Sequence, residues 1–171
     1  MLPTRSTACN MPAMTAEEKR DNYRSVARAV AGAVAPTKNT VSRMATVSCL
    51  LSEAFPHYYW TGFYLVDPDV ESQLIVGPYQ GTMGCLIIPF GKGVCDTAAA
   101  TGETQIVEDV HAFEGHIACD TQTNSEIVVP VYDAARKLIA VFDVDSTEPA
   151  SFDSLDKECL EDIMAQVFAT K

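Results

Sequence analysis

The sequence has few basic side chains and no long apolar run. It holds 12 Lys and Arg against 23 Asp and Glu in 171 residues, which gives a formal net charge of −11 at pH 7. A field of that sign repels phosphate, so we expect neither a nucleic acid nor an anionic membrane surface as a partner. No stretch reaches the roughly 18 apolar residues that a membrane span needs. The charge does tolerate a cationic or zwitterionic small ligand.

The N-terminal segment also lacks the features of an export signal. Residues 1–14 contain one basic residue, Arg5, and no continuous apolar stretch. We expect a flexible, solvated tail here, with only a faint hint of an organellar presequence, and a cytoplasmic protein. The rest of the chain, 15–171, has the length and the globular composition of a single domain, with 47% hydrophobic and 20% charged residues overall.

Cysteine is too scarce for a disulfide scaffold. Six cysteines in 171 residues are about 3.5%, below the roughly 8–10% of such scaffolds. A reducing compartment is therefore expected, in which each cysteine is either a buried apolar residue or a reactive thiol. The six are Cys9, Cys49, Cys85, Cys95, Cys119 and Cys159. Cys49 and Cys159 fall in helical segments, where packing is the simpler interpretation.

Two N-terminal segments have the apolar spacing of helices. Thr15 and Glu18 have the spacing of a capping box, and apolar residues then recur at helical spacing until Pro36. A second helix is predicted from about Thr40 to Phe55, where the following proline disfavours further helix.

From residue 58 onward the sequence becomes aromatic and β-branched, which is typical of strands. Strands are predicted at 58–66, 73–76, 85–89, 104–107, 125–131 and 138–145. A short helix is expected over 94–101, and a final helix opens at Phe152. This order predicts an α+β fold, a central antiparallel β-sheet with the N- and C-terminal helices packed on one face.

The segment 109–126 is long for a connection between two strands, and such loops are usually functional or disordered. It holds two histidines, several carboxylates and Cys119, which follows the small, flexible segment 115–118. Backbone N–H groups in such a segment can approach a ligand. A thiol beside a positive group or under several amides loses its proton readily. Cys119 is therefore either a nucleophile or an unreactive buried loop cysteine.

Three carboxylates are predicted to gather on the sheet. Asp143 and Asp145 project from the same face of one strand, and Glu126 opens the neighbouring strand. Such a cluster can bind an ammonium group, and crowding of like charges can keep one member protonated as a proton donor. A solvated strand end is the simpler alternative. We call these three residues the carboxylate cluster.

Two further cysteines flank the segment 86–94. Cys95 lies in the first turn of the predicted short helix, where the helix dipole favours a thiolate. A zinc site would have to draw on dispersed residues, and no CxxC or HxxxH spacing supports one, so no metal is expected. Those dispersed residues are Cys85, Cys95, His111, His116 and Cys119.

A series of motifs along the chain carries a family resemblance. They are WTGFYL at 60–65, GPYQG at 77–81, FGKGVCDTAAATG at 90–102, DVHAFEGHIACD at 109–120, NSEIVVPV at 124–131 and DVDS at 143–146. In this order they resemble the free methionine-(R)-sulfoxide reductases, which are stand-alone GAF-type domains. The resemblance covers nearly the whole chain after about Met14 and implies one GAF domain over 15–171.

The resemblance implies a thiol mechanism without a cofactor. Cys119 would attack the sulfur of free L-methionine-(R)-sulfoxide, release methionine and become a sulfenic acid. By motif position, Cys85 would be the main resolving thiol that forms a disulfide, and Cys95 a second participant. A thioredoxin-like protein would then reduce the disulfide. The family also suggests a homodimer.

The resemblance also gives the surrounding residues roles in substrate binding. The carboxylate cluster of Glu126, Asp143 and Asp145 would collectively protonate the sulfoxide oxygen and bind the substrate ammonium. Trp60 and Tyr64 would wall the thioether end, although core packing explains either residue as well. Backbone amides around Ile117 and Ala118 would hold the substrate carboxylate or the developing oxyanion.

Two other functions remain open at this point. A GAF domain can bind a small molecule without catalysis, but such sensors are usually fused to effector domains. A cysteine hydrolase would pair Cys119 with His111 or His116 as a base. Neither alternative has a use for Cys85 and Cys95.

Overall fold

The computed structural model describes residues 14–70, 72–91, 93–113 and 121–170. Its centre is a six-stranded antiparallel sheet with the strand order β3-β2-β1-β6-β5-β4. The strands are β1 (Trp60–Val66), β2 (Gln73–Gln80), β3 (Ile87–Pro89), β4 (Gln105–Val107), β5 (Ser125–Tyr132) and β6 (Leu138–Ser146). The helices are α1 (Ala16–Val34), α2 (Thr40–Ala54), α3 (Val94–Thr101) and α4 (Ser154–Phe168), with a 3-10 turn, η1 (Val110–Ala112).

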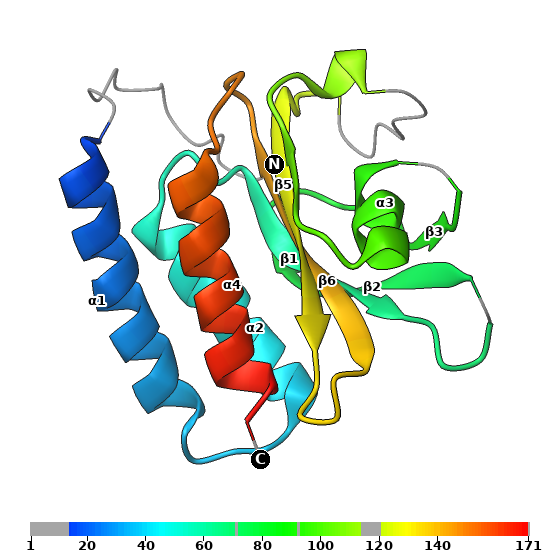
Figure 1. The fold of residues 1–171 in the computed structure, drawn as a ribbon, viewed down its shortest axis with the longest axis horizontal. Helices are drawn as coiled ribbons and strands as arrows, with labels where there is room; N and C mark the ends of the chain where they lie inside the picture. Colours follow the sequence, from blue (N-terminus) through cyan, green and yellow to red (C-terminus); the bar gives the residue numbers. More distant parts are fainter. Residues whose placement is uncertain (1–13, 71, 92, 114–120, 171) are drawn as a thin grey trace, which may run out of the picture.

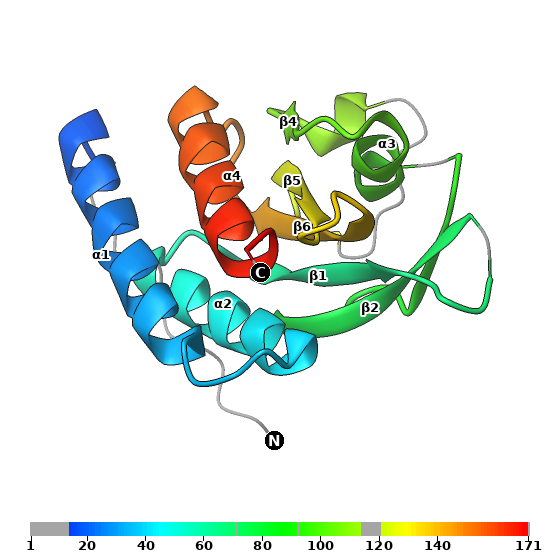
Figure 2. The same cartoon turned by 60° about the horizontal axis from the view of Figure 1, so that its bottom comes forward.

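The long helices lie on one face of the sheet and the short helix lies on the other (Figure 1). α2 and α4 contact the strands directly, and α1 packs against both of these helices. α3 covers β5 and β6 from the opposite side, as the turned view also shows (Figure 2). This arrangement confirms the predicted α+β fold with the terminal helices packed on one face of an antiparallel sheet.

Local sequence signals fix where the helices begin. The Thr15 side chain accepts a hydrogen bond from the Glu18 backbone N–H, and the Glu18 carboxylate accepts one from the Thr15 backbone, which completes the predicted capping box. The side chain of Asn39 caps α2, and that of Asp153 caps α4. In the described part of the chain, no helix is both long and apolar enough to cross a bilayer.

The sheet separates two apolar clusters because side chains alternate along each strand. Phe63 and Phe142 meet across β1 and β6 with ring centroids 4.9 Å apart, and they pack towards the long helices. Trp60 and Tyr64 face the opposite side, where they join Cys95 of α3 in the second cluster. The polar residues of interest lie on this second face.

The strand boundaries near the second cluster differ from the prediction. β2 runs four residues past the predicted end at Val76, and β3 begins at Ile87 rather than at Cys85. Gly81, with a φ of 122°, adopts a backbone conformation that ordinary residues avoid, and it turns the chain out of β2. Cys85 therefore lies in an irregular connection, 81–86, and not in a strand.

Candidate active site

The paired strands β5 and β6 bring the carboxylate cluster together. Glu126 lies directly opposite Asp145 in the strand register, and Asp143 is opposite Val128, two residues along. Glu126 and Asp143 are buried and Asp145 is half-buried. The predicted gathering of three carboxylates on one face is therefore present in the structure.

α3 places a thiol on top of this cluster. Cys95 lies in the first turn of α3, and its Sγ donates a weak hydrogen bond to Glu126 Oε1 at 3.9 Å. Ligand atoms of Cys95, Glu126 and Asp143 all lie within 4.8 Å of one another, and within the described residues these three form the group that could hold a metal ion. A structural zinc site uses four ligands, one more than this group provides.

Burial and mutual repulsion favour the protonated forms of these groups. Burial, and then the charges of Asp143 and Asp145, raise the pKa of Glu126 well above its ordinary value. Burial likewise raises the pKa of Asp143, whose Oδ1 makes no hydrogen bond within the described chain. The cluster can thus hold a proton at neutral pH and release it to a bound acceptor.

The helix start was predicted to favour a thiolate at Cys95, and the surroundings of this residue have the opposite effect. Burial, followed by the charges of Asp143 and Glu126, raises the pKa of the Cys95 thiol well above its ordinary value. The helix N-terminus favours an anion, but here burial, together with repulsion from two buried acids, outweighs the dipole. Cys95 is not disulfide-bonded, and its surroundings favour the protonated thiol.

Three aromatic rings form a stack beside the cluster. Trp60 lies between Tyr64 and Tyr79, with centroid distances of 5.4 and 5.1 Å and interplanar angles of 18° and 17°. Trp60 and Tyr64 share one face of β1, as their spacing predicts. Tyr79 was not singled out from the sequence, because β2 was predicted to end before it. Gly62 provides its space, since a Cβ there would lie 2.3 Å from Tyr79 Cβ.

The described cysteines differ in redox state. Cys85 is disulfide-bonded, whereas Cys49, Cys95 and Cys159 are free. Cys49 and Cys159 lie half-buried in α2 and α4, where the sequence predicted packing. A disulfide at Cys85 is the feature expected of a thiol that takes part in redox chemistry.

The remaining predicted residues divide into two groups. Ile117, Ala118, Cys119 and His116 lie outside the described residues. His111 is exposed in η1, and its Nε2 lies 3.1 Å from the side-chain oxygen of Asn124.

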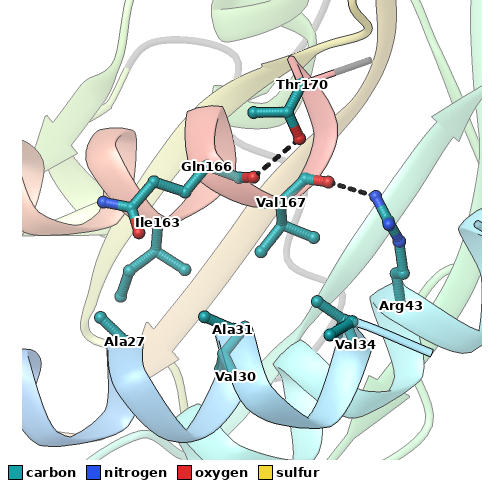
Figure 3. Close-up of a pocket in the computed structure, with 10 residues that line it drawn as sticks. Ala27, Val30, Ala31, Val34, Arg43, Ile163, Gln166, Val167 and Thr170 are labelled. Atoms are coloured by element: carbon teal, nitrogen blue, oxygen red, sulfur yellow. Dashed lines mark hydrogen bonds between the residues drawn. The ribbon is translucent and has the colours of Figure 1, made fainter. Parts of the chain in front are cut away.

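A separate cavity of about 190 Å³ lies on the helical face, between α1, α2 and α4 (Figure 3). Its walls are mainly apolar side chains of α1 and α4, such as Val30 and Ile163. Arg43 stands at one end and donates a hydrogen bond to the carbonyl of Val167 at 2.6 Å. This cavity shares no lining residue with the carboxylate cluster or the aromatic stack.

Comparisons with known proteins agree on one group of relatives. A sequence profile of the GAF domain matches residues 39–169. The chain is similar to the free methionine-R-sulfoxide reductase of Saccharomyces cerevisiae, at 46% identity over 127 residues, 72% of this chain and 71% of the relative. The enzyme of the same name from Escherichia coli is 40% identical over 149 residues, 87% of this chain and 88% of the relative.

A solved structure extends this similarity to the fold. It is the free methionine-R-sulfoxide reductase from Neisseria meningitidis in complex with its substrate, at 39% identity and a TM-score of 0.83, covering 91% of each chain. A structure of the corresponding Staphylococcus aureus protein in its reduced form is 40% identical, with a TM-score of 0.81, and covers 86% of this chain and 93% of that one.

Proposed function

This chain belongs to the GAF-type free methionine-R-sulfoxide reductases, and we propose that it reduces free L-methionine-(R)-sulfoxide to methionine by thiol chemistry. The family membership confirms the resemblance found in the sequence motifs, and it makes the chain an oxidoreductase. The observation that carries the thiol mechanism is the disulfide at Cys85, which packs against the same apolar cluster as the free Cys95.

The proposed reaction begins at Cys119. Its thiolate attacks the sulfoxide sulfur, and the oxygen passes to the Cys119 sulfur as its bond to the substrate sulfur breaks. Methionine leaves, and one proton from the carboxylate cluster completes the sulfenic acid on Cys119. The sulfur of Cys85 then displaces that oxygen as water and forms a disulfide with Cys119. A thioredoxin-like dithiol returns both cysteines to thiols. The two electrons that reduce the substrate thus come from the dithiol.

Disulfide pairing of Cys85 with Cys119 is supported by the states of the other cysteines. Cys49, Cys95 and Cys159 are free, so none of them is the partner of Cys85. The family resemblance favours Cys119 over the remaining candidate, Cys9. Cys95 would be a second participant in thiol exchange, since it lies free beside the acid cluster.

The carboxylate cluster would supply the proton and the charge for this chemistry. Departure of the sulfoxide oxygen needs an acid, and burial raises the pKa of both Glu126 and Asp143. A carboxylate of the same cluster, which includes Asp145, would bind the ammonium group of the free amino acid. This pairing of charges explains a preference for free over peptide-bound substrate, because a peptide lacks the ammonium group at that position.

Other contacts complete the proposed site. The rings of Trp60 and Tyr64 would wall the thioether end of the substrate, and backbone amides around Ile117 and Ala118 would hold its carboxylate or the developing oxyanion. We also propose a single GAF domain over 15–171, a homodimer that uses the N-terminal helices, and a cytoplasmic location, where thioredoxin-like reductants are active.

A reductant-coupled assay with both sulfoxide epimers, free and peptide-bound, tests the substrate. We expect turnover of the free R form alone. Cys119→Ser should abolish methionine formation, whereas Cys85→Ser should release about one methionine per enzyme and then recycle poorly. Cys159→Ser serves as the control and should retain full turnover.

The same assay decides between the alternatives. Turnover that survives Cys119→Ser would overturn the mechanism. Stoichiometric binding of the sulfoxide without methionine formation would identify a sensor. A hydrolase would need no reductant and would lose its activity in His111→Ala, a substitution that should leave the reductase unchanged.

A further inference from the structure

The connection that carries Cys85 rests on two aromatic side chains of β1. Trp60 Nε1 donates a hydrogen bond to the carbonyl of Thr82 at 3.1 Å. Gly84 is buried against both rings, because a Cβ placed on it would lie 2.8 Å from the Tyr64 hydroxyl oxygen and 3.1 Å from Trp60 Cζ2. The backbone immediately before Cys85 therefore lies directly on Trp60 and Tyr64, which we call the aromatic platform.

The platform reaches Cys85 itself through a hydroxyl group. The backbone N–H of Cys85 donates to the Tyr64 hydroxyl, next to the point where Gly84 packs. On the far side of Cys85, the carbonyl of Leu86 accepts a hydrogen bond of 3.0 Å from the Val76 backbone. Cys85 is thus held from both sides, by β1 before it and by β2 after it.

The platform is itself rigid. Tyr64 is 2% exposed and Trp60 is 3% exposed, and Trp60 is stacked between Tyr64 and Tyr79. A buried ring in a stack has few alternative rotamers. The Tyr64 hydroxyl is therefore a fixed acceptor, and the Cys85 segment takes its position from it.

We propose that Tyr64 and Gly84 position Cys85 for disulfide formation, so that the Tyr64 hydroxyl controls how fast the sulfenic acid of Cys119 is resolved. This inference rests on the proposed function. Disulfides form only in a narrow geometry, with Cα atoms about 4.4–6.8 Å apart. A connection of irregular backbone that was not held would spend much of its time outside that geometry. Tyr64 is a positioning residue in this role.

The controlled step is the attack of Cys85 on Cys119. The Cys85 sulfur bonds to the Cys119 sulfur while the S–O bond of the sulfenic acid breaks, and the oxygen leaves as water with the proton of the Cys85 thiol. The sulfoxide has already supplied the oxidising equivalent, so no other oxidant is needed. Methionine release precedes this step and does not depend on it.

Tyr64→Phe distinguishes positioning of Cys85 by the Tyr64 hydroxyl from contact between the Tyr64 ring and the substrate. Phenylalanine keeps the ring that would face the thioether but removes the acceptor for the Cys85 N–H. In a single turnover of reduced enzyme with free methionine-(R)-sulfoxide, methionine release and disulfide formation are timed separately, and we expect the ratio of the second rate to the first to fall below that of the wild type. Disulfide formation, followed by the loss of titratable thiols and by trapping of the sulfenic acid with dimedone, should slow roughly three- to tenfold, the equivalent of one hydrogen bond.

Gly84→Ala tests the same contact from the other partner. Gly84 does not have a left-handed backbone, so alanine there changes only the space between the segment and the platform. The added methyl group must displace the Cys85 segment from the Tyr64 hydroxyl, and it should also slow disulfide formation. In the Tyr64→Phe background the hydroxyl is gone, so the effect of Gly84→Ala should shrink, a coupling that a double-mutant cycle measures.

Tyr79→Phe is the matched control. Tyr79 also stacks on Trp60, and among the described residues no hydrogen bond is found for its hydroxyl. This variant should leave both methionine release and disulfide formation unchanged.

The outcomes distinguish this inference from the proposed function. If wild-type enzyme releases no methionine, the proposed function fails. If the wild type turns over but Tyr64→Phe and Gly84→Ala resolve the sulfenic acid at the wild-type rate, positioning by the platform is wrong. Slowed methionine release with normal resolution would assign Tyr64 to substrate binding alone. Circular dichroism and thermal melts of each variant identify any loss of fold, in which case the other variant decides.

Discussion

Two buried acidic groups on opposite faces of the sheet are neutralised in different ways. On the helical face, Asp156 is fully buried and bonds to Lys19 Nζ at 2.6 Å and to the Tyr23 hydroxyl at 2.8 Å. On the other face, Asp143 has a second acid, Glu126, and the Cys95 thiol as close neighbours. One aspartate has a cation, and the other lies among acids.

The difference in neighbours indicates a structural role for Asp156 and a chemical role for Asp143. The Asp156 group ties α1 to α4 and, through the Tyr58 hydroxyl 2.6 Å from that of Tyr23, to the start of the sheet. Burial alone would lower the pKa of Lys19, but its bonds to Asp156 and Asp153 outweigh burial and raise that pKa. A buried charge that is fully paired has little to give to a substrate. A crowded carboxyl that keeps its proton can transfer it.

The largest expected effect concerns catalysis. Glu126→Gln removes a proton donor from the carboxylate cluster, so kcat should fall by about 10²- to 10⁴-fold, the usual contribution of general acid catalysis. Lys19→Met, on the other face, should leave kcat within about twofold when both are measured below the melting temperature. Equal losses in the two variants would remove the distinction between the two faces.

The second effect concerns stability. Asp156→Ala leaves Lys19 and the Tyr23 hydroxyl without their buried partner, so the free energy of unfolding should fall by about 3 kcal/mol. Urea denaturation measures it. Asp162→Ala, an exposed residue of the same helix, should change the stability by no more than about 0.5 kcal/mol. A small change in Asp156→Ala would show that the Asp156 group is not a main support of the helical layer.

The third and smallest effect has the opposite sign. Because burial raises the pKa of Asp143, the native state retains a proton that the unfolded chain releases. The corresponding stability is complete below the ordinary carboxyl pKa of about 4, and it is lost as the pH rises through the raised native value.

Asp143→Asn removes this dependence. The variant should be more stable than the wild type at pH 8, by about 1 kcal/mol or about 2–4 °C in Tm, and the difference should shrink towards pH 5. A variant that is less stable than the wild type at pH 8 would contradict a raised pKa of Asp143 in the native state. The prediction thus completes the contrast: removal of one aspartate destabilises the protein, and removal of the other stabilises it.

The elements and the family were readable from local patterns. The capping box at Thr15 and Glu18 fixes the start of α1, and the proline after Phe55 accompanies the end of α2. The alternation that placed Asp143 and Asp145 on one face is a property of any strand, so the carboxylate cluster followed from spacing and strand order. Each of these signals depends only on residues that are close together in the chain, so it can be recognised from the sequence alone.

What sequence reasoning missed depends on neighbours from distant segments. Tyr79 joins the aromatic stack because Gly62, opposite it on β1, has no side chain in its way. Neither position predicts this contact unless the pairing of β1 with β2 is known. Cys85 was expected in a strand, but the chain leaves β2 at Gly81, which has a positive φ, and Cys85 lies in the connection before β3.

Local sequence patterns were sufficient to predict the fold class, the helix starts, the family and the set of acids and thiols available for chemistry. The protonation that each of those groups favours followed only from the folded arrangement. Cys95 has a helix start that favours a thiolate, yet burial, and then the two acids that β5 and β6 bring against it, raise the pKa of its thiol and favour the protonated form. A local sequence pattern sets the position of a side chain, but its proton depends on the burial and the charges that distant strands bring to it.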